Sequence, residues 1–512
     1  MTHSRPDWRT RGAAMLLAAW SAGLVACAAG PDYARPTVAT GESYGDAAAL
    51  AALRPRDIPA DWWTLFRQPA LDALIAEALQ NSPTLEAARQ AVQVAQASRE
   101  ALEASFWPQV QASYSPARTK IAGNLGGNSP GVQGDGSVIS TGSNTPKANG
   151  GTAPFNSPVI YNFHTAQVSV SYAPDVFGGN GRQVEASAAL ARAQQLEWQA
   201  ARITLTSNLV CAAILDGQLR GQLRAAEAAA RAATEALRLT ERLRRAGQVA
   251  AQDEASQRLA ALAAEQQLPP LRQQLAQNRN LIRALIGAPQ DRDLPVFELQ
   301  DFQLPQALPL SMPSQLLEQR PDVRAAEEQL HAATAQVGAA RAARLPQFAI
   351  TGNAGGAAAH LSQAFLASGR FFDLTASLTA PLFDAGAARH REQAAAAAAA
   401  QAQAQYRATA LAAVQNVADV LRAIESADPS ASLADQASRA AGQAADLAWR
   451  RVNAGDLDRA GALAAEMARH QADLQAAGAQ AGRLINAVAL YHALGGGWWH
   501  GDQPSRKPAP PP

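Results

Sequence analysis

The feature that most constrains this chain is a long stretch without proline, from Arg182 to Arg245. The stretch holds little glycine and runs for about 64 residues, which as an α-helix would be ~95 Å long. A second stretch, 389–451, matches it apart from an interruption at Asp428-Pro429. A compact domain has no use for helices of this length, so the pattern favours rods or coiled coils.

The segment after Gly455 shows how such a helix would pack. Apolar and small residues recur every seven positions in two interleaved series, Leu463, His470, Ala477, Leu484 and Tyr491, and Met467, Leu474, Ala481 and Val488. This is the a/d pattern of a coiled coil. Gly247 and Gly455 stand where left-handed turns would close two helical hairpins, and Pro269-Pro270 should kink or break the helix that follows the first turn.

The chain also repeats itself. The segment Asn81-Ser82-Pro83-Thr84 is echoed by Gln319-Arg320-Pro321-Asp322, and Trp107-Pro108-Gln109 by Leu345-Pro346-Gln347, both at an offset of 238. Later landmarks, such as Arg245-Ala246-Gly247 and Asn453-Ala454-Gly455, share an offset of 208. The first half therefore carries about 30 extra residues, which we place in an exposed Gly/Ser/Asn-rich loop at 120–157.

Four segments, near 108–116, 163–173, 346–354 and 371–380, alternate strictly between apolar and polar residues. The polar positions are uncharged apart from Asp373. A half-buried strand of a soluble sheet gives the same alternation, but so does a lipid-facing barrel strand. Open sheet edges are not tolerated in lipid, and four strands cannot enclose a pore. We therefore infer a cyclic oligomer in which each copy contributes two hairpins.

Composition narrows the function classes. Of the 512 residues 48% are hydrophobic, much of this alanine, and only 5% are aromatic. The 44 Lys and Arg nearly balance the 43 Asp and Glu, which argues against nucleic acid as a partner. Past residue 26 no apolar run approaches the ~20 residues of a membrane helix. Two cysteines exclude a disulfide scaffold, and Cys211 is expected to be a buried, inert thiol.

The first residues set the compartment. Arg5, Arg9 and Arg11 precede a short apolar stretch at 13–26, as in a secretory signal peptide. The stretch ends in Leu24-Val25-Ala26-Cys27, which resembles a bacterial lipobox. In such signals the cysteine becomes the first mature residue and carries the lipid, so Cys27 is the expected lipidation site. Acyl chains contribute about 0.8 kcal/mol per buried CH₂.

The whole order of segments resembles the TolC/OprM-like outer-membrane efflux proteins, in particular the NodT-type lipoproteins that serve RND pumps. The resemblance runs from about Cys27 to Trp499. Its marks are Cys27–Tyr33 with Pro36, Trp62-Trp63-Thr64-Leu65-Phe66, Leu71–Ile75 leading to Asn81, Pro269-Pro270, and Ala380-Pro381-Leu382-Phe383-Asp384.

The resemblance implies a mainly α protein with a membrane β part. A homotrimer would form a 12-stranded outer-membrane β-barrel and a periplasmic tunnel of long helical hairpins, with a collar from segments near 36–66, 288–312, 426–436 and the tail. The implied function is a passive duct of a tripartite efflux system. Its implied partners are a periplasmic adaptor (membrane fusion) protein, an inner-membrane RND pump and outer-membrane lipid.

The predicted organisation follows the repeat. We assign a signal peptide to 1–26, the anchor and N-terminal collar segment to 27–66, the first repeat to 67–300 with long helices at 182–245 and 249–286, the second repeat to 301–497 with long helices at 388–452 and 457–494, and a Pro-rich tail to 498–512.

No catalytic constellation emerges from the sequence, and neither a cofactor nor a metal is expected. The chain lacks G-x-x-x-x-G-K-[ST], H-E-x-x-H and G-x-S-x-G, and its eight histidines are scattered. An enzyme on a helical scaffold is therefore disfavoured. Two alternatives stay open, a type I protein-secretion duct and, with less support from the alternating strands, a periplasmic coiled-coil adaptor.

By the same resemblance, the periplasmic gate would lie at the two hairpin turns. In TolC-like relatives, aspartates shortly after the second turn line the constriction, but the matching positions here fall near Gly461 and Ala464, which are not acidic. The remaining candidates are Arg245, Gly247, Asp253, Gly455, Asp456, Asp458 and Arg459. They either cap helix ends, or contribute an inter-chain Arg–Asp contact that holds the gate closed.

Overall fold

The computed structural model describes residues 29–39, 41, 57–121, 159–305, 308–309 and 313–500. The chain divides into two compact units, 1–34 with 96–189 and 331–401, and 35–95 with 190–330 and 402–512. Each unit therefore takes segments from both halves of the repeat. The predicted signal peptide, Cys27, most of the predicted loop 120–157 and the tail beyond residue 500 lie outside the described residues.

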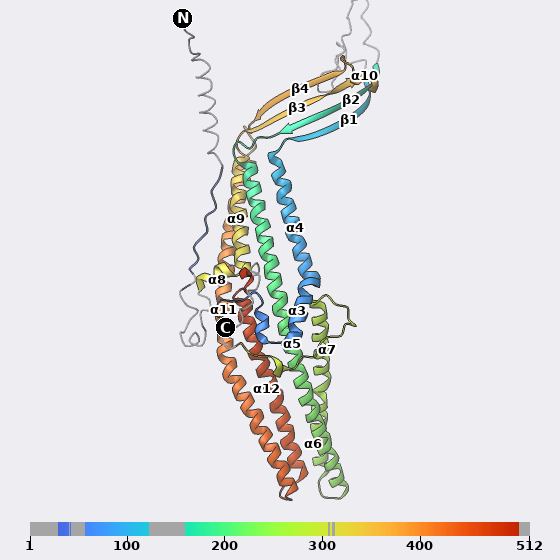
Figure 1. Ribbon diagram of the computed structural model, residues 1–512, viewed down its shortest axis with the longest axis vertical. Helices are drawn as coiled ribbons and strands as arrows, with labels where there is room; N and C mark the ends of the chain where they lie inside the picture. The colour runs from blue at the N-terminus through green and yellow to red at the C-terminus, as the bar shows by residue number, and fades with distance from the viewer. Residues whose placement is uncertain are drawn as a thin grey trace, which may run out of the picture. The chain divides into compact units, whose positions relative to one another are not determined.

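Long helices account for most of the chain, and four strands interrupt them (Figure 1). The elements are η2 (Trp62–Phe66), α3 (Pro69–Asn81), α4 (Pro83–Glu103), η3 (Ala104–Phe106), β1 (Gln109–Ile121), β2 (Val159–Tyr172), α5 (Gly179–Arg245), α6 (Ala251–Gln266), α7 (Leu268–Leu285), η4 (Leu299–Asp301), α8 (Pro313–Gln319), α9 (Pro321–Ala342), β3 (Gln347–Ala358), α10 (Leu361–Ala364), β4 (Arg370–Thr379), α11 (Ala387–Asn453), α12 (Arg459–Ala493) and η5 (Trp498–His500).

The first unit contains one antiparallel sheet in the order β1-β2-β3-β4. The four predicted strands are thus confirmed, and the two hairpins pair through β2 and β3. The prediction of a loop from residue 120 is wrong at its start, because β1 continues to Ile121. Lys120 and Ile121 lie opposite Ile160 and Val159 of β2, so these residues extend the ladder instead of leaving it.

Helix α5 begins beside the sheet because a short corner ends β2. Gly178, at φ 72°, turns the chain, and the Asp175 carboxylate accepts a hydrogen bond from the Gly181 N–H at 2.7 Å. In the second half, Asp384 accepts from the N–H of Ala388 at 2.7 Å in the same way. A carboxylate at a helix N-terminus satisfies backbone donors that the helix leaves unpaired. Pro174 and Pro381 stand in these two corners, between strand and helix.

The residues that follow Cys27 are fixed against the first unit. The Asp32 carboxylate lies 2.6 Å from the Arg182 guanidinium, and the Tyr33 ring stacks on His331 at 4.4 Å. His331 lies 2.9 Å from Glu185. Burial alone would raise the pKa of Glu185, but the hydrogen bonds from Arg182 and His331 outweigh it and hold that pKa below its usual value.

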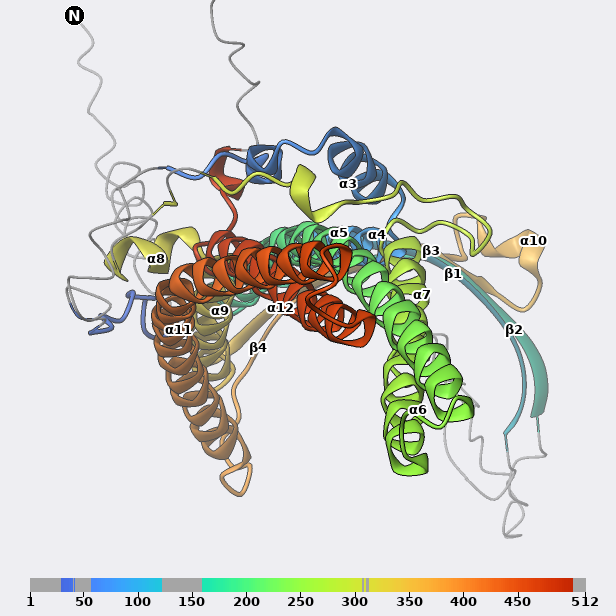
Figure 2. The ribbon, with the colours of Figure 1, turned by 90° about the horizontal axis from the view of Figure 1, so that it is seen from below.

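In the second unit, α6 and α7 run alongside α5 (Figures 1 and 2). The predicted break at the proline pair is confirmed, because α6 ends at Gln266 and α7 starts at Leu268 with Pro269 in its first turn. Proline is tolerated there, since the N–H it lacks would have no helical partner. Ion pairs join α7 and α6 to α5, such as Arg272 to Glu227 at 2.9 Å.

Pro429 interrupts the proline-free stretch of the sequence but does not end its helix. Helix α11 is continuous over 67 residues with Pro429 inside it. A proline in this position removes one backbone hydrogen bond, but neighbouring polar groups add others. The Ser430 hydroxyl donates to the Ser426 carbonyl at 2.7 Å, and Arg483 of α12 lies 2.5 Å from Asp428.

The core of the second unit combines aromatic packing with one buried charge. Trp62 is fully buried and stacks on Tyr491 at 5.1 Å, and Trp63 is also buried. The Asp216 carboxylate is inaccessible to solvent and lies 2.7 Å from Arg220 and 3.5 Å from Arg279. Since an unpaired buried carboxylate is very unfavourable, both arginines are needed to keep Asp216 in this core.

Candidate functional site

The sheet presents an apolar face and a polar face. Cross-strand pairs such as Val110 with Val170 and Phe348 with Leu378 put the apolar residues of all four strands on one side. Its largest side chains are solvent-exposed, with Phe372 at 85% and Leu374 at 78%. The remaining large members are Val110, Tyr114, Val168, Val170, Phe348, Ile350 and Leu378. A continuous exposed apolar face of this kind marks contact with lipid or another protein.

The opposite face is polar along its whole width. Gln111 lies opposite Ser169, Ser171 opposite Thr351, and Thr351 opposite Thr375. The charged member, Asp373, accepts a hydrogen bond from the Asn353 amide at 3.1 Å. A sheet that is apolar on one side and polar on the other is typical of a barrel with lipid outside and water inside.

The first hairpin turn lies between α5 and α6 in the second unit. Gly247 adopts φ 75°, which favours glycine. The Asp253 carboxylate accepts a hydrogen bond from the Ala250 N–H at 3.0 Å, and Arg245 donates to the Glu241 carbonyl at 3.3 Å. Across the turn, Arg244 forms an ion pair with Glu254. Asp253 and Arg245 therefore stabilise the helix ends of their own hairpin.

The second hairpin turn joins α11 to α12 in the same way. Gly455 adopts φ 78°. The Asp456 carboxylate lies 2.7 Å from Arg451 of the preceding helix. The Asp458 carboxylate caps α12 by accepting from the Gly461 N–H at 2.8 Å. Gly461, one of the positions matched to an acidic residue in TolC-like relatives, thus lies in the first turn of α12 and donates to the cap.

One candidate residue connects the two hairpins. Arg459 of α12 lies 3.2 Å from Glu235 of α5, and its guanidinium stands 5.7 Å from the ring centre of Trp449. The Trp449 indole donates to Glu466 at 2.9 Å. Next to these groups, Leu463 packs with Ala232 and Ala236 of α5. The arrangement holds the end of α12 against α5 through one ion pair and a small apolar cluster.

The sequence predicted the two turns, but not most of the residues that contact the candidate side chains there. Glu235, Trp449 and Glu466 were not among the candidate residues. Glu235 belongs to a different hairpin from Arg459, so no spacing along the chain could have paired them. The pairing of Arg451 with Asp456 had a weak signal in the sequence. Arg451 lies five positions before Asp456, on the other side of a predicted glycine turn.

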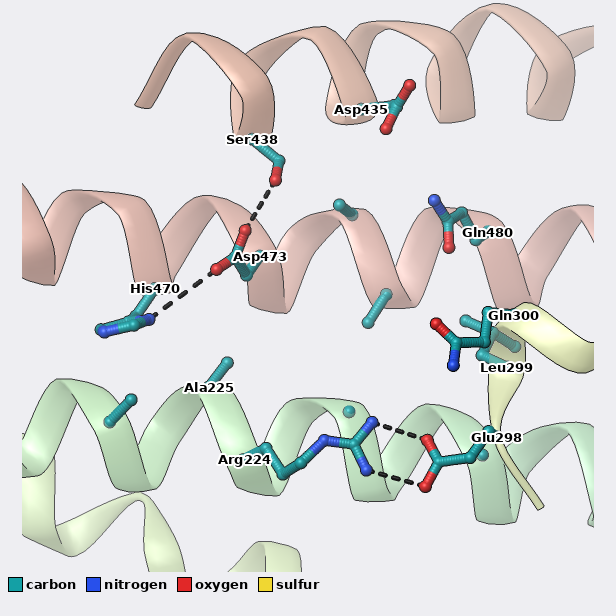
Figure 3. A pocket seen from close by; sticks show the side chains of 15 residues that line it. Arg224, Ala225, Glu298, Leu299, Gln300, Asp435, Ser438, His470, Asp473 and Gln480 are labelled. Carbon is teal, nitrogen blue, oxygen red and sulfur yellow. Dashed lines mark hydrogen bonds and ion pairs between the residues drawn. The ribbon is translucent and has the colours of Figure 1, made fainter. Parts of the chain in front are cut away.

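A pocket of about 410 Å³ opens between α5, α11, α12 and the segment around η4 (Figure 3). Arg224 makes two hydrogen bonds to Glu298, at 2.8 and 2.7 Å, and they hold the pKa of Glu298 below its usual value. Asp473 accepts from Ser438 at 2.6 Å and lies 3.7 Å from His470. These charged side chains already have partners, so the pocket does not define a ligand.

The described residues contain one free thiol, but neither a metal-binding cluster nor a long apolar helix. Across the described ranges, histidine, cysteine and carboxylate side chains form no cluster of three that could hold a metal ion. Within the same ranges, the helices lack an apolar stretch long enough to cross a bilayer. Burial raises the pKa of the half-buried Cys211 thiol to about 11. The reactive thiolate is therefore scarce at neutral pH, in keeping with the predicted inert role.

Long helical hairpins joined to strands with one apolar face define a protein of the outer-membrane channel type. The sequence profile of the outer membrane efflux protein family matches residues 74–288 and 312–496. The chain therefore belongs to this family, whose members are channel proteins and not enzymes.

Individual relatives agree with this assignment. The pyoverdine export outer membrane protein OpmQ of Pseudomonas putida is 30% identical over 446 residues, which cover 87% of this chain and 89% of OpmQ. The toluene efflux pump outer membrane protein TtgF of the same species is 28% identical, over 94% and 96% of the two chains. The structure of the outer-membrane channel OprN superimposes with a TM-score of 0.76 at 27% identity, over 92% of this chain and all of OprN.

Proposed function

We propose that three copies of this chain form a passive duct through the outer membrane. The duct would receive small molecules from an inner-membrane RND pump through a periplasmic adaptor protein. The single observation that carries this proposal is the sheet, with its exposed apolar face and its polar face, on which Asp373 is charged. Such a sheet satisfies both lipid outside and water inside when it closes into a barrel.

Closure is what requires more than one copy. Within the described sheet, β1 and β4 are the outermost strands, so each has one edge without a neighbouring strand. Backbone groups that lack a hydrogen-bond partner in lipid cost several kcal/mol each. Pairing β4 of one copy with β1 of the next would satisfy both edges, and three copies would give the 12 strands expected from the family resemblance.

The names of the relatives favour small molecules as substrates. OpmQ is described as exporting pyoverdine and TtgF as part of a toluene efflux pump. We therefore favour small-molecule export over type I protein secretion. The pump and adaptor would then select the substrate, because the described residues on the polar face of the sheet do not form a binding site.

We also propose Cys27 as the lipid anchor of the mature chain. Two residues further along the sequence, the described part of the chain begins at Ala29. The Ala29 N–H donates to the Phe177 carbonyl at 3.0 Å, in the corner between β2 and α5. Palmitate labelling that is lost in the Cys27→Ser variant checks the assignment.

The duct is tested by deleting the gene in the producing bacterium. We expect the deletion strain to accumulate more of a fluorescent dye or a toxic small molecule, and a plasmid copy to restore export. Outer-membrane fractionation of the complemented strain is the control for location. Loss of a secreted protein with unchanged dye accumulation would favour protein secretion, and recovery of the chain in the soluble periplasm would favour an adaptor.

The hairpin turns are the proposed periplasmic gate. Arg245, Gly247, Asp253, Gly455, Asp456, Asp458 and Arg459 all lie at or next to them. Within one chain the Asp456 carboxylate pairs with Arg451, and Asp458 caps α12. We propose that in the trimer these carboxylates also face an arginine of the neighbouring copy and hold the gate closed.

The gate proposal predicts that Asp456→Ala and Asp458→Ala trimers open more often. An exposed ion pair contributes about 0.5 kcal/mol, so three copies lose roughly 1.5 kcal/mol and the open–closed equilibrium shifts roughly tenfold. Conductance in planar bilayers measures the shift. Arg422→Ala, which removes an exposed pair with Glu425 within α11, is the control. Unchanged closure in both aspartate variants would contradict the proposal.

A further inference from the structure

All four strands join helices at the same end of the sheet. Strand β1 starts after η3 and β3 after α9, whereas β2 and β4 lead into α5 and α11. The opposite end, here called the distal end, holds α10 (Figure 1). In the proposed duct the helices lie in the periplasm, so the distal end of the sheet faces the outside of the cell.

The basic residues of the strands lie toward the distal end, and all of them are on the apolar face. They are Arg118, Lys120, His164 and Arg370. Residues an even number of positions apart on a strand point to the same face. Arg118 lies eight positions after Val110, and Arg370 lies two before Phe372. The same count places Lys120 and His164 on the face of Val110.

The polar face is different at this end. Its described residues there are Ala117 and Thr119 of β1, Phe163 and Thr165 of β2, Ala357 of β3 and Phe371 of β4. The acidic residue of the strands, Asp373, also lies on the polar face. Contact with water alone would not favour one face over the other. The division of charge therefore points to what the apolar face contacts.

The basic residues border an apolar band of about the height of a membrane. The band begins at the pair Phe348 and Leu378 and ends at the pair Gly356 and Arg370, eight positions further along β3. Eight residues span ~27 Å along a strand, and a strand tilt of ~40° reduces the height to ~21 Å. The apolar band of an outer-membrane barrel is about 25 Å tall. Arg370 would therefore lie at the level of the lipid headgroups.

Tyr114 marks the same level on β1, because it lies in one row of the sheet with Arg370. Its hydroxyl is 2.9 Å from Nδ1 of His164, and the two rings stack at 6.1 Å. Aromatic rings flank the apolar band at the two interfaces of outer-membrane barrels. Arg118 and Lys120 lie four and six positions beyond Tyr114, outside the apolar band.

Helix α10 adds apolar side chains beside Arg370. The helix is folded onto the apolar face, since a Cβ on Gly356 would come within 2.0 Å of the Ala364 carbonyl oxygen. The Nε of Arg370 donates a hydrogen bond to the Phe365 carbonyl at 2.8 Å. The exposed apolar residues of α10 and of the turn after it are Leu361, Phe365 and Leu366. Apolar side chains next to an arginine fit a ligand with both acyl chains and an anionic group.

The positive charges at the distal end lack an acidic partner within the part of the chain that the structure describes. Arg118, Lys120 and Arg370 are exposed and form no ion pair with a described residue. Arg118 and Lys120 are only ~7 Å apart along β1, so their charges repel each other. An anionic ligand would relieve this repulsion. Guanidinium groups bind phosphate well, because two parallel N–H groups match two phosphate oxygens.

We propose that the distal end of the apolar face binds the phosphate groups of the lipid in the outer leaflet, the phosphorylated glycolipid lipopolysaccharide. Arg118, Lys120 and Arg370 would contact the phosphates, and the apolar residues around α10 would contact the acyl chains. The inference rests on the proposed duct, because it needs the sheet in the outer membrane. It adds a class of lipid and the residues that contact it. A trimer would carry nine such charges, three from each copy.

Binding of lipid A, the acylated and phosphorylated end of lipopolysaccharide, to purified trimers tests the proposal. Native mass spectrometry in detergent should show tighter binding of lipid A with two phosphates than of lipid A without phosphate. A Lys or Arg near an anionic membrane surface strengthens binding about fivefold. Arg118→Gln/Lys120→Gln/Arg370→Gln should therefore bind the phosphorylated form roughly a hundredfold more weakly, and the dephosphorylated form as before.

An exchange of two neighbouring residues separates the effect of the face from that of net charge. Arg118→Thr/Thr119→Arg keeps the composition but moves the guanidinium to the polar face. It should weaken binding of phosphorylated lipid A by about fivefold, as much as Arg118→Thr alone. Inorganic phosphate at the same phosphate concentration should not displace the lipid. Displacement would indicate a site for soluble anions and would overturn the lipid site.

The remaining outcomes distinguish the lipid site from the duct. Equal binding of the two forms of lipid A to the unmodified trimer would overturn the lipid site, and this comparison needs no variant. Unchanged binding by the triple variant would do the same. Dye export by the unmodified chain would still support the duct in both cases. Absence of the unmodified chain from the outer-membrane fraction would overturn the duct and the lipid site together.

Discussion

Replacing Asp216 by alanine is expected to lower the free energy of unfolding by about 3–5 kcal/mol, the cost of breaking a buried ion pair. The Asp216 side chain is fully buried against Arg220 and Arg279. Arg279 in turn donates to the Leu294 carbonyl at 3.1 Å, so Asp216 also helps to position the segment after α7. The denaturation midpoint followed by circular dichroism measures the loss.

An exposed ion pair provides the matched comparison. Arg89→Ala removes a contact with Glu86 at 3.7 Å, in which both side chains are more than half exposed. Such pairs contribute about 0–1 kcal/mol, so this variant should unfold at nearly the midpoint of the unmodified chain. Asp216→Asn, which keeps the volume but loses the charge, should fall between the two. A midpoint for Asp216→Ala equal to that of Arg89→Ala would show that the buried pair is not needed.

The second large effect is expected on barrel assembly, when a charge is placed on the apolar face of the sheet. In the proposed barrel Leu374→Arg places a charge in lipid, at a cost of about 2–4 kcal/mol in each copy near the bilayer centre. Leu374 is on the apolar face, opposite Gly352, and is 78% exposed in the single chain. We expect this variant to yield few heat-modifiable trimers on unheated gels and little protein in the outer-membrane fraction.

The neighbouring residue is a control of the same size and charge. Thr375 follows Leu374 in β4 and, by the alternation of a strand, faces the polar side opposite Thr351. In a closed barrel this side faces water, so Thr375→Arg should assemble almost as well as the unmodified chain. Equal assembly of both arginine variants, or poorer assembly of Thr375→Arg, would contradict the proposed orientation of the sheet.

Secondary structure was accessible from the sequence because the patterns are long and regular. The two long stretches became α5 and α11, which continues through Pro429, and strict alternation located all four strands. An error occurred where a local signal competed with a tertiary contact. The Gly/Ser/Asn-rich loop was predicted to start at residue 120, yet Lys120 and Ile121 pair with β2.

The hairpin ends show which contacts the sequence does not predict. Glycines and flanking charges marked both turns, and the structure has left-handed glycines at Gly247 and Gly455. The partner of Arg459, however, is Glu235 on another hairpin. Sequence spacing determines contacts within a helix or across a short turn, because those distances follow from helix geometry. It does not determine which helices lie side by side.

The sequence by itself therefore determined the two-fold repeat, the helix and strand types, the apolar and polar strand faces, and the family resemblance. These follow from periodicity, which is a property of neighbouring residues along one chain. Only the tertiary structure decided which surfaces are covered. Alanines are buried where α5 packs on α9 and exposed at the start of α11, because burial depends on the element that packs opposite.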